Sequence, residues 1–346
     1  MKIAVDAMGG DRGPAIIVEG AVRAAREFGA SVILVGDEPA VTRELRRHQT
    51  HGLQVEVRHA SQVVAMDELP SLALRRKRDS SIRVAADLVR GGEASALVSA
   101  GNTGAAMAIA VVVLGVLPRV DRPAIAVVLP NLRGRTMLLD VGANVDSKPR
   151  HLLQFAIMGH VYARDILGVT APRVGLLSIG EEEGKGNELT REAFKELEAS
   201  GLRFIGNVEG RDIYNGNADV VVTDGFTGNV ALKISESLAD MLVALIREEL
   251  TRTPLAKLGG LLARPALRRF LKRVDYNELG GAPLLGINGA CFICHGASPP
   301  KAIMGAIRIA REWVEVKVND HIRAALAGEL AGILRGRARA GEGGRT

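Results

Sequence analysis

Short apolar segments alternate through most of the chain with longer segments whose apolar residues recur every three or four positions. The apolar segments predict buried strands over Lys2–Asp6, Ser31–Val35, Leu97–Ser99, Ala124–Leu129, Met137–Asp140, Arg173–Ile179 and Asp219–Val222. The amphipathic segments predict helices over Pro14–Phe28, Pro39–Arg47, Asp79–Arg90, Gly104–Leu114, Pro149–Leu167 and Asn187–Ala199. Because such alternation is typical of a largely parallel sheet with helices on both faces, the sequence predicts a three-layer α/β fold.

One region departs from this alternation and is helical throughout, from about residue 235 to residue 274. A long amphipathic helix reaching about Glu249 is followed by Pro254 and Pro265, each with leucines at helical spacing behind it. We therefore expect a single α/β domain over residues 1–335, from which a helical excursion protrudes. The Gly/Arg-rich residues 336–346 have the composition of a disordered tail.

Positive charge is concentrated in this excursion. The formal net charge is +6, yet the stretch from Arg252 to Arg273 alone contains seven basic residues and no acidic one. The rest of the chain is therefore close to neutral. A local cluster of this kind suits an anionic membrane surface, an acidic protein, a nucleic acid or a phosphate-bearing ligand.

The sequence shows neither an export signal nor a disulfide pattern. Two cysteines cannot form a disulfide framework, and the first residues lack the apolar stretch of a signal peptide. The uninterrupted apolar run Ala105–Leu117 is too short for a transmembrane helix and predicts a buried helix instead. We therefore expect a cytoplasmic protein.

Five loops combine glycine with Asn, Thr or Asp at the points where predicted strands lead into helices. They are Asp6–Asp11, Ser99–Gly104, Asp140–Asn144, Gly180–Asn187 and Asp224–Asn229. Each loop alone is also explained by a tight turn that requires glycine. Five together favour a polar anion-binding cleft, because glycine lets backbone amides approach an anion and a helix start adds positive potential.

Several catalytic motifs are excluded on inspection. Gly184-Lys185-Gly186 lacks the glycine spacing and the following Ser/Thr of a P-loop, and no dinucleotide fingerprint follows the first strand. No serine occupies a nucleophile elbow. Cys291-Phe-Ile-Cys294-His295 matches the attachment pattern of c-type haem, but without an export signal the cysteines are interpreted as small buried hydrophobic residues. We therefore expect no metal and no cofactor.

Two polar side chains each allow two interpretations. Lys185, in a loop with three glutamates, is either a phosphate ligand or one half of a solvated ion pair. Asn229, which follows Gly228, is either a helix N-cap or a donor to a developing oxyanion.

The five loops, in this order, closely resemble the PlsX family of bacterial phosphate acyltransferases. The resemblance covers nearly the whole chain and extends to five further motifs: Met66-Asp67-Glu68, Lys77-Arg-Asp-Ser-Ser81, Gly206-Asn-Val-Glu-Gly210, Gly280-Gly-Ala-Pro-Leu-Leu-Gly286 and His295-Gly296. Two features depart from the family pattern, namely the cysteine pair and Met304-Gly305, where an Asn-Ala pair is usual. Neither feature touches the five loops.

The resemblance implies a reaction and its partners. Fatty acyl-[acyl carrier protein] and inorganic phosphate would give acyl phosphate and free carrier protein, in phospholipid (phosphatidic acid) biosynthesis. It also implies a homodimer whose fold is similar to those of isocitrate and isopropylmalate dehydrogenases and of phosphotransacetylases. The product would pass to a membrane glycerol-3-phosphate acyltransferase.

The loop residues fit this chemistry, because a phosphate dianion needs only proximity and a stabilised oxyanion. We expect Lys185 and the amides near Asn102–Gly104 to hold phosphate and Asn229 to donate to the oxyanion. His295 would either protonate the leaving thiolate or make a structural hydrogen bond. The other residues expected to bind phosphate or the acyl carrier are Gly10, Asp11, Ser99, Thr103, Asn144, Asn187, Asp224 and Thr227.

The basic excursion gains a role from the same resemblance. Its apolar and basic residues predict peripheral contact with an anionic membrane: Leu255, Leu258, Leu262, Leu267, Phe270, Lys257 and Arg268. The acidic carrier protein competes for the same cations, and a dimer contact with a solvated basic face is a third interpretation.

Three rival functions remain at this point. The nearest is a coenzyme-A-dependent phosphate acetyl- or butyryltransferase. A decarboxylating dehydrogenase would require a cluster of aspartates for Mg²⁺ that the sequence lacks. A basic module that binds membrane or nucleic acid would leave the polar loops unexplained, so we expect no nucleic-acid partner.

Overall fold

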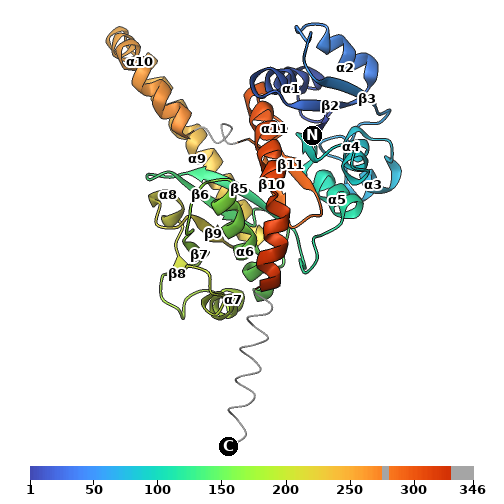
Figure 1. The fold of residues 1–346 in the computed structure, drawn as a ribbon. Coiled ribbons are helices and arrows are strands. Elements are labelled where there is room, and N and C mark those ends of the chain that lie inside the picture. The colour runs from blue at the N-terminus through green and yellow to red at the C-terminus, as the bar shows by residue number, and fades with distance from the viewer. Residues whose placement is uncertain (275–279, 329–346) are drawn as a thin grey trace, which may run out of the picture.

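The computed structural model describes residues 1–274 and 280–328, with side chains to 271 and from 280 (Figure 1). These residues form an eleven-stranded sheet of order β3-β2-β1-β4-β11-β10-β5-β6-β9-β7-β8, with helices on both faces. The expected three-layer arrangement of a mixed α/β protein is confirmed. The tail predicted over residues 336–346 lies outside the described residues.

One half of the sheet is parallel throughout. Its strands are β1 (Lys2–Asp6), β2 (Ser31–Gly36), β3 (Val55–His59), β4 (Ala96–Ser99) and β11 (Ala290–Ile293). The other half is also parallel and consists of β6 (Arg135–Leu139), β7 (Val174–Leu177), β8 (Phe204–Val208) and β9 (Val220–Val222). Between the halves lie β10 (Ala282–Leu285) and β5 (Ala124–Pro130).

The three central pairings, β11–β10, β10–β5 and β5–β6, are antiparallel. Three reversals in a row make the two halves run in opposite directions. The prediction of a largely parallel sheet did not include this reversal. Opposite directions would normally place the carboxyl ends of the two halves at opposite edges of the sheet, but the register of the central strands brings them together. Ile293 ends β11 opposite Ala282, and Leu139 ends β6 opposite Ala126. With Leu284 opposite Ile125 between them, the carboxyl ends of both halves reach nearly the same level in the middle of the sheet.

Each face of the sheet buries its own apolar core. On one face the core includes α1 (Pro14–Phe28), α6 (Pro149–Asp165), α7 (Glu188–Glu198) and α11 (Pro300–Glu315). On the other it includes α3 (Pro70–Arg76), α4 (Ser81–Arg90), α5 (Thr103–Leu114) and the start of α9 (Gly225–Thr251). The fold also contains α2 (Glu38–Leu45), α8 (Asp212–Asn215) and α10 (Pro254–Val274), and a helical segment over residues 318–328.

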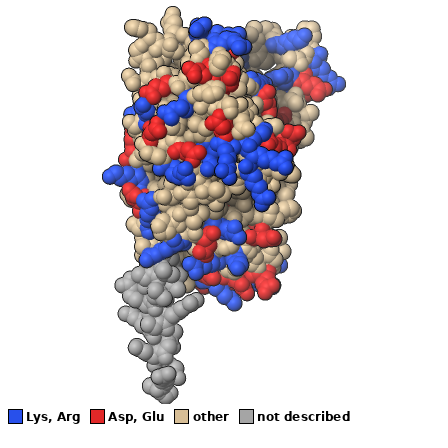
Figure 2. Space-filling view, turned by 90° about the vertical axis from the view of Figure 1, so that its right-hand side faces the viewer, with Lys and Arg blue, Asp and Glu red and all other residues tan. Residues whose placement is uncertain are grey.

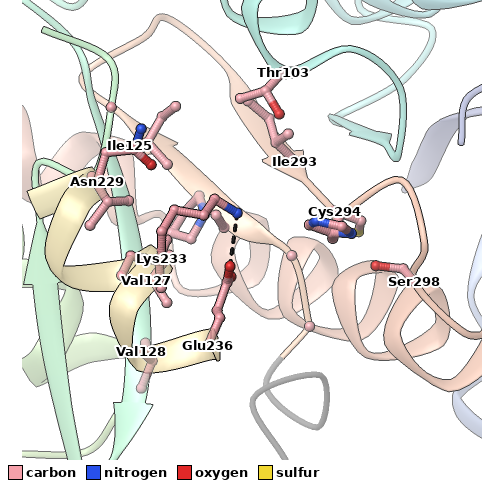
Figure 3. Close-up of a pocket in the computed structure, with 18 of the residues that line it drawn as sticks. Thr103, Ile125, Val127, Val128, Asn229, Lys233, Glu236, Ile293, Cys294 and Ser298 are labelled. Atoms are coloured by element: carbon pink, nitrogen blue, oxygen red, sulfur yellow. Dashed lines mark hydrogen bonds and ion pairs between the residues drawn. The ribbon is translucent and has the colours of Figure 1, made fainter. Parts of the chain in front are cut away.

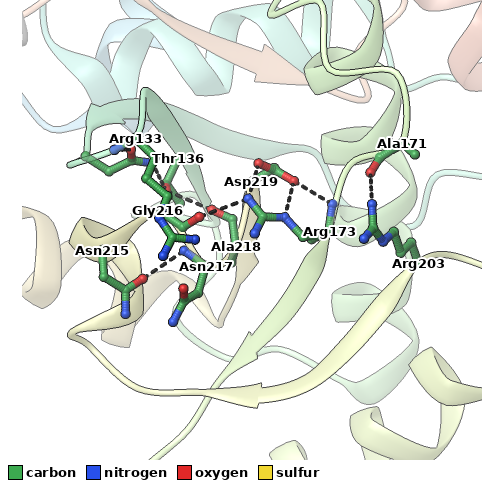
Figure 4. Close-up of polar contacts among 11 residues, drawn as sticks. Arg133, Thr136, Ala171, Arg173, Arg203, Asn215, Gly216, Asn217, Ala218 and Asp219 are labelled. Carbon is green, nitrogen blue, oxygen red and sulfur yellow. Dashed lines mark hydrogen bonds and ion pairs between the residues drawn. The ribbon is translucent and has the colours of Figure 1, made fainter.

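An ion pair ties together the amino ends of β7 and β9 (Figure 4). Arg173 donates Nε and Nη2 to the two carboxylate oxygens of Asp219, each at 2.9 Å, and donates Nη2 to the Gly216 carbonyl. Burial opposes ionisation of Asp219, but the hydrogen bonds from Arg173 hold the pKa of that carboxyl below its ordinary value. A two-point guanidinium–carboxylate contact of this kind fixes the alignment of the strands.

The helical excursion consists of the outer part of α9 together with α10, which pack against each other and project from the body (Figure 1). Its helices continue to Thr251 and from Pro254 to Val274, as the leucine spacing predicted. Within the described part of the chain, no helix combines the length and apolar character needed to cross a membrane.

Candidate active site

A cavity of about 360 Å³ opens where the two halves of the sheet separate (Figure 3). Among the described residues, β10 and β5 pair only at Leu284–Ile125 and Leu285–Ala124, so the strands diverge beyond Leu284. We call this space the central cavity. Its polar lining includes Thr103, Asn229, Lys233, Glu236 and His295, and its apolar lining includes Ile125, Val127, Val128, Leu232 and Ile293.

Asn229 reaches the central cavity from the second turn of α9 (Figure 3). The N-cap of this helix is Asp224, whose carboxylate accepts from the Thr227 amide at 2.9 Å and from the Thr227 hydroxyl. The N-cap interpretation of Asn229 is therefore wrong, because the helix begins four residues earlier. Asp224 and Thr227 are placed to cap the helix.

Asp140, at the end of β6, supports the approach of Asn229. Its fully buried carboxylate accepts from the amides of Ile125, Gly142, Ala143 and Asn144 at 2.7–3.2 Å, and from the Asn144 side chain at 2.8 Å. Burial raises the pKa of Asp140, and these hydrogen bonds oppose the rise. Asn144 therefore has a structural role, because its hydrogen bonds hold the Asp140 carboxylate in place. Gly142 lies beside the Asn229 side chain and has a φ of 132°, a conformation that favours glycine.

Thr103 enters the central cavity from the opposite side, at the start of α5 (Figure 3). Asn102 is the N-cap and accepts from the Ala105 amide at 3.0 Å. Its side-chain amide donates to the carbonyls of Ala65, Met66 and Glu68, which ties the segment before α3 to this helix. The amides of Thr103 and Gly104 open the helix without intrahelical acceptors.

A second buried carboxylate, Asp6, orders the loops beside α5. Ser99 Oγ donates to Asp6 at 2.7 Å and accepts from the Gly101 amide at 3.0 Å. Burial raises the pKa of Asp6. Hydrogen bonds from the side chains of Ser81 and Ser99 and from the amides of Met8 and Gly9 oppose the rise.

Gly10 and Asp11 lie against the loop that follows β11. The Asp11 amide donates to the Gly296 carbonyl at 2.9 Å, and a Cβ on Gly10 would lie 3.0 Å from the same oxygen. Gly10, Asp11 and Ser99 therefore make contacts that hold the neighbouring loops together.

His295, two residues after the end of β11, lines the central cavity. Its Nδ1 accepts from the Ala297 amide at 3.1 Å, so the neutral ring carries its proton on Nε2. One nitrogen therefore makes a structural hydrogen bond, and the other carries a proton that it can donate. The adjacent Cys294 and Cys291 are buried, as expected, and burial raises the pKa of both thiols to about 12.

Lys185 and Asn187 lie apart from this group. Within the described residues, the lining of the central cavity contains no residue of the 180–187 loop. Lys185 is exposed beside Glu182, and Asn187 caps α7 by accepting from the Thr190 amide at 2.9 Å. Strands β9 and β6 separate β7, which leads into this loop, from β5 at the cavity.

Known proteins identify the family of this chain. A sequence model described as "Fatty acid synthesis protein" matches residues 1–321. The chain is 56% identical over 334 residues to a phosphate acyltransferase of Geobacter sulfurreducens, covering 96% of each protein. It is also 56% identical to a phosphate acyltransferase of Pelotomaculum thermopropionicum, covering 94% of this chain and 95% of that one. The chain belongs to this phosphate acyltransferase family. It is accordingly an acyltransferase, and the resemblance read from the loops is confirmed.

Solved structures of lower identity share the fold of this acyltransferase. A phosphotransacetylase from Streptococcus pyogenes superposes with a TM-score of 0.63 at 18% identity, covering 91% of this chain and 94% of that one. The EutD phosphotransacetylase from Staphylococcus aureus gives 0.61 at 17% identity, with 90% and 94% covered. These likenesses concern the fold alone. The expected likeness to isocitrate and isopropylmalate dehydrogenases stays a prediction.

Two charged residues of the acyltransferase cavity, Lys233 and Glu236, were not predicted from the sequence. Lys233 Nζ donates to Glu236 Oε2 at 2.8 Å at the mouth of the cavity (Figure 3). Their positions four and seven residues after Asn229 place all three on one face of α9. This helical spacing would have predicted both residues if the face of α9 that carries Asn229 had been taken as part of the site.

Proposed function

We propose that this acyltransferase moves a fatty-acyl group from the thioester of an acyl carrier protein to inorganic phosphate. The observation that carries the proposal is the central cavity, which combines apolar walls with hydrogen-bond donors from Asn229, His295 and the start of α5. The thiol beside it, Cys294, has its pKa raised to about 12 and is a poor nucleophile at neutral pH. The arrangement fits direct attack by phosphate, without a covalent enzyme intermediate.

In the proposed step, a phosphate oxygen attacks the thioester carbonyl carbon and forms a tetrahedral oxyanion. The carbon–sulfur bond then breaks, which leaves an acyl phosphate and a thiolate. The proton of HPO₄²⁻ ends on the sulfur, so charge and atoms balance. Asn229 donates to the oxyanion, and the Nε2 proton of His295 faces the departing sulfur.

The decisive experiment measures phosphate-dependent loss of palmitoyl thioester from acyl carrier protein, with palmitoyl- and acetyl-coenzyme A tested alongside. We expect preference for the carrier-bound substrate and an acyl phosphate that hydroxylamine traps as the hydroxamate. Turnover of acetyl-coenzyme A alone would favour the coenzyme-A-dependent phosphate acetyltransferase. Thioester loss that does not depend on phosphate would refute the proposed reaction.

Exposed cations on the α3 side of the molecule support an acidic carrier as partner. Figure 2 views the side that carries α3, α4 and α5, and Lys and Arg side chains gather there. Arg75, Arg76 and Arg78 are exposed at the end of α3 and, within the described residues, form no ion pair. Asn102 connects the segment before α3 to the start of α5. In our proposal the carrier uses these cations as well as those of α10.

Membrane contact through α10 is the second part of the proposal. Leu255 and Leu262 are each 77% exposed, Leu258 is 54% exposed, and Phe270 is exposed while Leu267 is partly covered. Lys257 and Arg268 lie exposed among them. Apolar and basic side chains together suit the interface of an anionic membrane, where a glycerol-3-phosphate acyltransferase would receive the product.

We expect Leu258→Glu to weaken flotation with anionic liposomes about tenfold or more, because it removes a leucine that the membrane would bury and adds a charge that anionic lipid repels. Val112→Glu, at an exposed apolar position on α5, is the matched control and should float like the wild type. A wild-type protein that does not float, or a Leu258→Glu protein that floats equally well, would exclude the membrane role.

Self-association is proposed on α9. Ile234, Leu238, Met241 and Leu245 are exposed at helical spacing along its outer face. A second copy covering this stripe would form the homodimer that the family resemblance implies. Sedimentation equilibrium would refute the dimer if the protein stayed a monomer at micromolar concentration.

A further inference from the structure

Lys233 gives the central cavity its positive charge. Among the described residues that line the cavity, it is the only Lys or Arg side chain. Its side chain is 56% exposed, and its ammonium group turns toward the open centre of the cavity, where Glu236 accepts from it (Figure 3). The glutamate is more buried, with 19% of its side chain exposed.

The groups that face Lys233 also favour an anion. Across the cavity stands Thr103, the first residue of α5. The Ala105 amide is already used by Asn102, whereas the amides of Thr103 and Gly104 have no intrahelical acceptor and carry the positive end of the helix dipole. An anion between α9 and α5 would therefore meet a full positive charge on one side and the positive end of the α5 dipole on the other.

We propose that Lys233 binds the phosphate nucleophile, and that Glu236 holds its ammonium group while the phosphate site is vacant. This inference rests on the proposed function. Exchange of partners is easy, because Lys233 is more than half exposed and solvent weakens its ion pair with Glu236. A phosphate dianion offers the ammonium group twice the charge of one carboxylate. Bound there, phosphate lies on the same face of α9 as Asn229, one turn away, beside the donor that receives the oxyanion.

The competing assignment, Lys185, has weaker support from the geometry. It lies on an exposed loop with Glu181, Glu182 and Glu183, and its amide donates to the Glu182 carbonyl at 3.0 Å. Three carboxylates repel phosphate, and the loop does not reach the lining of the central cavity in the described part of the chain.

The first test is the dependence of turnover on phosphate concentration. We expect Lys233→Gln to raise the KM for phosphate about tenfold to a hundredfold, as for the loss of a charged hydrogen-bond partner, with the KM for acyl carrier protein changed less than twofold. Lys233→Arg should restore part of the loss. Glu236→Gln should lower the KM for phosphate, because the ammonium group is no longer paired. Lys195→Gln, an exposed lysine on α7, is the control.

Direct binding of inorganic phosphate, measured by isothermal titration without acyl substrate, separates this inference from the proposed reaction. Weaker phosphate binding by Lys233→Gln supports the inference even if no acyl transfer is found. Unchanged phosphate affinity and KM in Lys233→Gln would overturn it while active wild-type enzyme preserved the proposed function. A rise in the phosphate KM for Lys185→Gln but not for Lys233→Gln would overturn it in favour of the acidic loop.

Discussion

Replacement of Asn229 by alanine should lower kcat by about 10²–10³ while the protein remains folded. A single donor to a tetrahedral oxyanion typically contributes this much, because the charge develops only in the transition state. Asn229 lines the central cavity, and among the described residues its side chain makes no hydrogen bond that the fold needs. The loss should therefore appear in kcat and kcat/KM with acyl carrier protein, measured at saturating phosphate.

Two comparisons separate catalysis from structure in this prediction. Asn229→Asp keeps the shape but cannot donate when ionised, so it should lose at least as much activity as the alanine variant. Both variants should unfold at nearly the wild-type denaturant concentration, since exposed substitutions usually change stability by less than about 0.5 kcal/mol. An alanine variant that keeps a third or more of the wild-type kcat would remove Asn229 from the reaction.

Local sequence signals set the first elements of the fold accurately. The helix Pro14–Phe28 was predicted with its observed bounds, because Pro14 begins it and Gly29, in the left-handed conformation, ends it. The strand Lys2–Asp6 was equally clear from its apolar run. The predicted region 235–274 is helical apart from the short connection before Pro254, because leucines at helical spacing dominate it.

The centre of the sheet could not be obtained in the same way. β10 and β11 are four-residue strands among glycines, too short to establish a periodicity of their own. Their partners, β5 and β4, lie more than 150 residues away in sequence, so the pairing is a tertiary property. The reversal of direction between the halves follows from these strands, and with it the position of the central cavity.

The candidate site was predicted only in part, because local sequence signals mark loops but do not show which helix faces come together in the fold. Glycine and asparagine mark loops, so the loops carrying Thr103 and Asn229 were identified, as was His295. Lys185 was predicted to bind phosphate because it lies in such a loop. Lys233 lies inside a helix, where a lysine normally indicates a solvated face, and only the packing of α9 over β6 directs it to the cavity.

Gly228→Ala should destabilise the protein by about 3 kcal/mol, because the new methyl group has no space. A Cβ on Gly228 would lie 1.9 Å from the Asp140 carbonyl oxygen and 2.9 Å from Thr223 Cγ2. Asp140 cannot withdraw, because its amide donates to Thr223 at 3.1 Å and its carboxylate accepts from the Ile125 and Asn144 amides. Overpacking against fixed backbone costs at least as much as overpacking among side chains.

The same substitution should also impair catalysis, since Asn229 is the next residue and moves with any displacement of α9. Urea unfolding gives the stability, and kcat measured on the folded fraction gives the second effect. Gly259→Ala is the matched control in α10, where a Cβ meets no atom within 4 Å and alanine should stabilise the helix by about 0.5–1 kcal/mol. If Gly228→Ala unfolded at the wild-type urea concentration, α9 would not approach Asp140 this closely, and the position given to Asn229 would fail with it.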